Sequence, residues 1–69
     1  MMLVFANSST QATSWARAYG LKPHVWRFIG DYDDVRGYLD NPVVILPSWK
    51  ATNDQQEALA YLRAMGALA

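Results

Sequence analysis

Two short runs of consecutive apolar residues constrain the fold of this chain more than any other feature of its sequence. They lie at residues 3–6 and 43–46, and a polar segment or a proline follows each of them directly. A run of four apolar residues is too short for a buried helix and is typical of a strand that is covered on both faces. Strands of this kind belong to parallel sheets.

A helix is predicted after the first run, over about residues 9–19. Ser8 and Gln11 have the spacing of a capping box, in which a hydroxyl accepts from a main-chain N–H and an amide reaches back. Gly20 can adopt the left-handed conformation that closes a helix, and Pro23 prevents its continuation. Apolar residues recur at helical spacing in between: Ala12, Trp15, Ala16 and Tyr19.

A second helix is predicted from Thr52 or Asn53 to about Gly66. Asp54 and Glu57 lie in or near its first turn, where acidic side chains are favourable. Its apolar stripe consists of Ala58, Leu59, Leu62 and Met65.

Residues 25–29 combine β-branched and aromatic side chains and predict a third strand between the two apolar runs. Arg27 lies inside this strand, which favours a position at the edge of the sheet. A single helical turn is predicted next, beginning at Asp33 or Asp34 and ending at Gly37.

The order of these elements predicts one α/β domain over residues 1–69, with a three-stranded parallel sheet and helices on both faces. The two most apolar strands are expected to be neighbours and the strand with Arg27 to lie at an edge, which gives the spatial order 2-1-3. The orders 1-3-2 and 3-2-1 remain open. The side chains expected to be fully buried include Val4, Ala16, Ile45 and Leu59.

Large apolar side chains are abundant for a chain with so little interior. Hydrophobic residues make up 52% of the 69 residues, including three Trp, four Tyr and two Phe, whereas charged residues make up 17%. A domain of this size buries only about 60% of its unfolded surface, and a contiguous exposed apolar patch usually marks a partner. We therefore expect a homodimer or another homo-oligomer, or a complex with another protein chain.

The charge and cysteine counts narrow the function classes further. Six basic and six acidic residues give a net charge of zero, which disfavours a nucleic-acid partner but leaves a nucleic-acid-associated accessory factor as a weaker alternative. A single histidine and no cysteine exclude a zinc staple and fit a reducing compartment. No segment has the length of a membrane span or of a signal-peptide core, so we expect a cytoplasmic protein.

An anion or nucleotide site is the second function that the sequence allows. Ligands of open parallel sheets bind at the carboxyl ends of the strands. There the helix start at Ser8, Ser9 and Thr10 could offer N–H groups to an anion, and Lys50 could add a positive charge. The same residues are also what an ordinary helix cap and a solvated loop require.

No catalytic or cofactor motif is present in the sequence. The loop after residues 3–6 lacks the glycines and lysine of a phosphate-binding loop. His24, the one histidine, precedes residues 25–29 and is expected at the amino end of the sheet, away from the usual site. Asp31, Asp33 and Asp34 lack the spacing of a calcium loop and fit a turn with a helix cap. We expect a protein that is not an enzyme and that binds neither a cofactor nor a metal.

Four aromatic residues are candidates for a protein interface. Trp49 follows the apolar run 43–46 in a polar loop, and Tyr32 and Tyr38 flank the acidic turn. Trp26, on the strand with Arg27, and Trp49 are the expected anchors of a dimer contact, because Trp and Tyr are frequent in such contacts.

Two segments resemble pieces of the P-loop ATPase core of phage terminases and helicases. Residues 3–12 followed by Ala16-Arg17 resemble its strand, turn and helix, and residues 35–37 followed by 43–46 resemble the Arg-Gly turn before its metal-site strand. The family's phosphate loop is absent, and the strand ends in Pro47-Ser48 where the family has Asp-Glu, so no residue inherits the metal or general-base role.

The chain also resembles the small α/β proteins encoded by actinobacterial phages. The resemblance lies in Ala6-Asn7, in the helix with Gln11-Ala12 and Trp15-Ala16-Arg17, and in the turn Arg36-Gly37. It implies a non-enzymatic accessory protein that acts on a host or phage protein, in the cytoplasm of the host cell.

Overall fold

Three short strands and two α-helices form the fold in the computed structural model, which describes residues 1–38 and 41–66. In chain order the elements are β1 (Met2–Phe5), α1 (Ser9–Ala18), the 3₁₀ turn η1 (Pro23–Val25), β2 (Trp26–Phe28), the 3₁₀ turn η2 (Tyr32–Asp34), β3 (Val43–Ile45) and α2 (Asn53–Ala64). The strands form one parallel sheet in the order β2-β1-β3. The predicted fold class and the order 2-1-3 are confirmed, and the two alternative orders are excluded.

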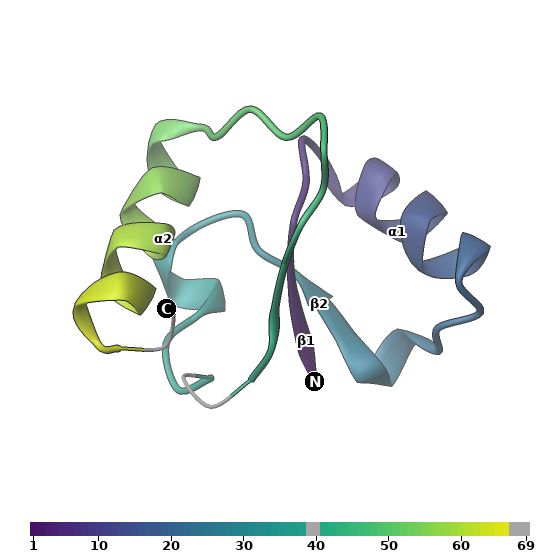
Figure 1. Cartoon of the computed structure of the whole chain (residues 1–69), viewed down its shortest axis with the longest axis horizontal. Coiled ribbons are helices and arrows are strands. Elements are labelled where there is room, and N and C mark those ends of the chain that lie inside the picture. The colour runs from purple at the N-terminus through teal and green to yellow at the C-terminus, as the bar shows by residue number, and fades with distance from the viewer. Residues whose placement is uncertain (39–40, 67–69) are drawn as a thin grey trace.

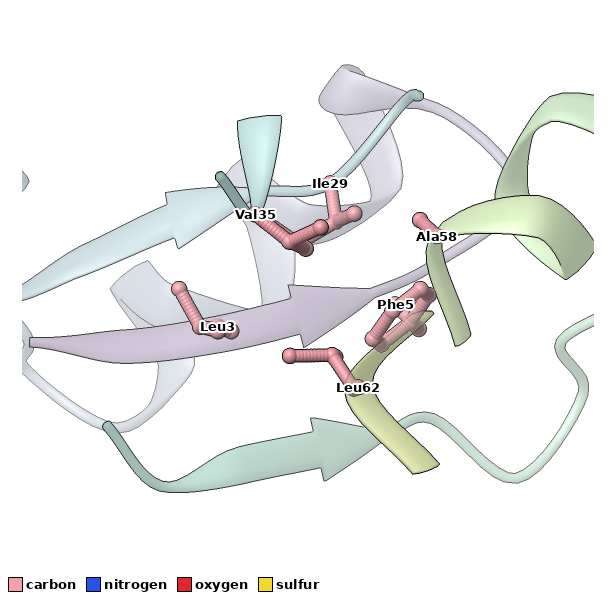
Figure 2. Close-up of a cluster of buried hydrophobic side chains, with 6 residues drawn as sticks. All are labelled: Leu3, Phe5, Ile29, Val35, Ala58 and Leu62. Atoms are coloured by element: carbon pink, nitrogen blue, oxygen red, sulfur yellow. The ribbon is translucent and has the colours of Figure 1, made fainter. Parts of the chain in front are cut away.

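β1 lies between the two other strands and pairs with both. Leu3 is opposite Arg27 of β2 on one side and opposite Val43 of β3 on the other, and Phe5 is opposite Ile45. Figure 2 shows the three strands pointing in the same direction, with β1 in the middle. The prediction that the arginine-bearing strand is an edge strand is confirmed.

The helices cover opposite faces of the sheet, as Figure 1 shows, with α1 on one side and α2 on the other. Successive residues of β1 therefore point into different hydrophobic clusters. The cluster on the α2 face, drawn in Figure 2, is formed by Leu3, Phe5, Ile29, Val35, Ala58 and Leu62. The smaller cluster on the α1 face is formed by Val4, Ala6, Ala12 and Leu46.

Both α-helices begin at hydroxyl caps close to the predicted positions. The Ser8 hydroxyl accepts from the Gln11 N–H over 3.1 Å, while the Gln11 side-chain oxygen accepts from the N–H of Asn7 rather than from that of Ser8. Thr52 and Gln55 form a complete capping box at the start of α2. At the other end of α1, Gly20 adopts a φ of 68°, in the left-handed region predicted for it.

Two of the four side chains predicted to be fully buried are not. Val4 and Ala16 are buried as expected, whereas Leu59 is only partly buried and Ile45 is 48% exposed. The α2-face cluster is centred on β1, the end of β2 and the residues around η2, and α2 packs chiefly against η2. β3 lies at the margin of that cluster, so Ile45 at its end remains uncovered.

Tyr19, expected in the core on the inner face of the first helix, is also placed differently. The helix ends at Ala18, one residue earlier than predicted, and Tyr19 is its C-cap residue. Its side chain is 70% exposed and lies against Trp15, with the ring centroids 5.4 Å apart. Tyr19 therefore does not belong to the core.

Candidate functional site

The carboxyl ends of the strands are the position where a parallel sheet of this order would bind a ligand. Here the two loops that follow β1 and β3 are tied to each other by side chains. Asn7 accepts from the N–H of Lys50 over 2.6 Å and donates to the carbonyl of Ser48 over 3.0 Å. Gln11 adds a bond from its Nε2 to the Ser48 hydroxyl over 3.2 Å. The chain itself therefore bridges the carboxyl ends of β1 and β3.

The residues predicted to bind an anion lie at this end of the sheet, at the start of α1 and in the loop after β3. The Ser8 hydroxyl is engaged as the helix cap, and the Ser9 carbonyl accepts from Thr13 over 2.8 Å. Thr10 and Lys50 are exposed, and Lys50 meets the β1 loop through its main-chain N–H. No pocket is found in the part of the chain that the structure describes.

Gln55 occupies the other side of the same edge, between the ends of β1 and β2. Its side chain is buried, with 2% of the residue exposed. Its Nε2 donates to the carbonyls of Ala6 over 2.8 Å and Ile29 over 2.9 Å. Its Oε1 accepts from the Trp49 indole N–H over 3.0 Å and from the Thr52 N–H over 3.1 Å. Every donor and acceptor position of the amide is thereby used.

Sequence reasoning missed Gln55, although a signal for it exists. The spacing Thr52-x-x-Gln55 is that of a capping box, which predicts one of its four bonds. The remaining bonds depend on the carbonyls that follow β1 and β2. These carbonyls lie beyond the strand ends and need donors from elsewhere in the fold.

The four aromatic interface candidates are divided between the two faces. Trp49 packs on Phe5, with a centroid distance of 5.1 Å, Tyr32 meets Tyr61 edge-on at 4.8 Å, and Tyr38 lies 5.1 Å from the guanidinium of Arg27. These three belong to the surroundings of the α2-face cluster, whereas Trp26 packs beside the α1-face cluster. The structure therefore does not bring the four rings together into one patch.

The acidic turn caps η2, but the capping residue is Asp31 rather than the predicted Asp33 or Asp34, and the turn covers Tyr32–Asp34 instead of running on to Gly37. Asp31 accepts from the Asp34 N–H over 3.3 Å, and Asp34 accepts from the Gly30 N–H over 2.8 Å. Asp34 also pairs with Arg27 over 3.1 Å. Within residues 1–38 and 41–66, no group of acidic or histidine side chains is arranged to hold a metal ion.

The outer edge of β3 carries main-chain groups that nothing in the described chain engages. Leu3 donates to the carbonyl of Pro42 over 2.8 Å, and Leu46 donates to the carbonyl of Phe5 over 3.1 Å. In this parallel register Val44 directs its N–H and C=O to β1, so those of Val43 and Ile45 point away from the sheet. No hydrogen bond from the described residues reaches them.

The side chains along this edge are apolar and incompletely covered. Val43 and Val44 are half-buried on opposite faces, Ile45 is exposed, and β3 carries no charged residue. On the face covered by α1, the residues that this helix buries are Ala12 and Ala16, and α1 contacts β2 most closely. We call Val43, Val44 and Ile45, with the outward main-chain groups of Val43 and Ile45, the β3 surface.

Within the described residues, neither α-helix is long and apolar enough to cross a bilayer. His24 lies exposed in η1, just before β2 and therefore at the amino end of the sheet, where the sequence placed it. Comparison of the chain with protein-family models, with curated proteins and with solved structures finds no match.

Proposed function

We propose that this chain is a non-enzymatic protein-interaction module that binds its partner through the β3 surface. The observation that carries the proposal is the uncharged edge strand with its uncovered Ile45, which is 48% exposed. Natural proteins usually protect an edge strand with charges, proline or a covering element, because its free N–H and C=O groups pair readily with another strand. If the chain is phage-encoded, as its resemblance implies, that partner is a host or phage protein.

The arrangement at the carboxyl ends of the strands supports binding in preference to catalysis. This is where a parallel α/β sheet would hold substrate. Gln55 and Asn7 fill it with hydrogen bonds between the chain's own groups. The apolar edge of β3 is a separate feature and needs none of these groups.

Affinity capture with matched variants tests the proposed function. The tagged chain, an Ile45→Lys variant and a Tyr19→Lys variant are incubated with lysate of the cell in which the chain is naturally made, and captured proteins are identified by mass spectrometry. Tyr19 is the appropriate control because it is a large exposed apolar residue at the end of α1. We expect the parent and Tyr19→Lys to retain the same partner and Ile45→Lys to lose it.

Circular dichroism and urea unfolding of the three proteins provide the folding control. Ile45 and Tyr19 are both exposed, so both lysine variants should fold. Equal capture of a partner by all three folded proteins would place the binding surface elsewhere and overturn the proposal.

A further inference from the structure

We infer that β3 pairs antiparallel with β3 of a second copy of this chain, about a two-fold axis that passes beside Val44. The inference rests on the proposed function, because it names one partner for the β3 surface. The product is a continuous six-stranded sheet in which each copy keeps its own order β2-β1-β3. The two copies use the same patch, as a two-fold contact requires.

The main-chain groups of the edge complement themselves in this register. The N–H and C=O of Val43 face those of the partner's Ile45, and Ile45 faces the partner's Val43, which gives four hydrogen bonds. Val44 lies opposite its own counterpart as a non-hydrogen-bonded pair. The next outward position is Pro47, which has no N–H, so the ladder ends there.

The same register covers the exposed side chain on this edge. Ile45 and Val43 lie on one face of β3, so Ile45 would pack beside the partner's Val43. On the other face, the half-buried Val44 would meet the partner's Val44. The contact removes apolar surface from water on both faces of the joined sheet.

Charge favours a second copy at this edge and disfavours the β2 edge. The chain has a net charge of zero, and residues 43–46 carry no charge, so two copies approach without repulsion. β2 carries Arg27, which is held by Asp34 at 3.1 Å, and a charged residue on an edge strand is a common protection against pairing. Trp49, expected from the sequence as an anchor, is already engaged by Phe5 and Gln55.

The size of the contact sets the strength of the dimer. A standard stable interface buries about 800 Å² of each partner's surface. The whole accessible surface of this chain is 4463 Å². Three residues of one edge strand supply less than a standard interface. We therefore expect a dissociation constant on the order of micromolar or weaker.

Sedimentation equilibrium over about 1–500 µM covers this range of dissociation constants and tests for the dimer. The parent and Tyr19→Lys should pass from the monomer mass toward twice that mass as concentration rises, and Ile45→Lys should remain a monomer. A monomer mass for the parent at every concentration would overturn the inference.

Disulfide trapping tests the register, because the natural chain has no cysteine. Facing residues of a non-hydrogen-bonded pair have Cβ atoms about 4.5–5.5 Å apart, close enough for a disulfide to form after a small adjustment. Val44→Cys should therefore form a covalent dimer under oxidised glutathione, whereas Ile45→Cys and Tyr19→Cys should do so much more slowly. Equal rates for the three variants would refute this pairing even if a dimer exists.

The two proposals fail in distinguishable ways. If the parent is monomeric and Ile45→Lys still loses a captured partner, the β3 surface binds a different protein and only the second copy is ruled out. If the parent is monomeric and capture does not depend on Ile45, both proposals are wrong.

Discussion

The side-chain amide of Gln55 donates to the main-chain oxygen of Ala6 over 2.8 Å, across 49 residues of sequence. This bond ties the first turn of α2 to the end of the middle strand. A second bond from the same nitrogen to Ile29 brings in the end of β2. One buried amide thus joins the carboxyl ends of two strands to the helix that covers them.

Gln55→Leu should lower the free energy of unfolding by about 2–4 kcal/mol, because the buried carbonyls and the indole N–H that the amide now satisfies would lose their partner. Leucine has a similar size and a good helix propensity, so the decrease in the free energy of unfolding would measure the contribution of the hydrogen bonds. Urea unfolding followed by circular dichroism measures it.

Gln56→Leu is the matched control, since Gln56 is the exposed neighbour on the same helix. Its effect should stay within about 0.5 kcal/mol. Equal stability of the two leucine variants would show that the bonds of Gln55 contribute little to the fold.

Ile45→Ala should cost less than about 1.5 kcal/mol, well below the about 2–5 kcal/mol typical of a fully buried isoleucine. The reason is its exposure of 48%. Leu62→Ala, at a fully buried position of the α2-face cluster, should cost about 2–5 kcal/mol. Unfolding at low micromolar concentration keeps self-association out of the comparison, and a larger loss for Ile45→Ala than for Leu62→Ala would contradict the placement of β3 at the margin of the core.

The edge position of β2 could be predicted because one residue breaks the apolar pattern. Arg27 in the middle of β2 fits an edge strand better than a central one, but this leaves either β1 or β3 as the middle strand, and the structure places β1 there. The helix ends could be predicted as well, since Ser8, Thr52 and Gly20 act through contacts within a few residues. Signals of this kind are local and need no tertiary information.

The exposure of Ile45 and the long-range bonds of Gln55 could not be predicted, because both depend on where α2 packs on the sheet. Its position is set by packing against η2, including the edge-on contact of Tyr32 with Tyr61 at 4.8 Å. An apolar run indicates that a strand is buried on average, but it does not show which residues of the strand a helix covers. Ile45 belongs to such a run, yet α2 leaves it exposed. Likewise, two of the bonds of Gln55 span 49 and 26 residues and have no local signature.

Asn7→Ala should loosen the contact between the β1 and β3 loops while leaving the rest of the fold in place. The substitution removes the acceptor for the Lys50 N–H and the donor to the Ser48 carbonyl. Because the site is exposed, we expect a cost of about 1 kcal/mol and a local rise in amide exchange at Lys50. NMR-detected hydrogen exchange measures it.

Ser48→Ala is the control for this effect, since it removes only the side-chain bond from Gln11 and keeps the carbonyl. Exchange at Lys50 should change little in that variant. An unchanged Lys50 amide in Asn7→Ala would mean that the two loops are held together by other contacts.

Phosphate and Mg²⁺-ATP should not stabilise the chain. No pocket is found at this end of the sheet in the described residues, and the Asn7 and Gln11 side chains already tie the two loops together. A ligand present at 100 times its dissociation constant stabilises a protein by about 2.7 kcal/mol, which for a domain of this size raises Tm by roughly 10 °C or more. We therefore expect thermal unfolding with either ligand to match unfolding in sodium chloride of equal ionic strength, and phosphate release from Mg²⁺-ATP to match buffer alone.

The parent should be compared with Lys50→Ala, because general salt effects act on both proteins alike. A rise in Tm, or a release of phosphate, that the parent shows and Lys50→Ala lacks would establish an anion site at this end of the sheet.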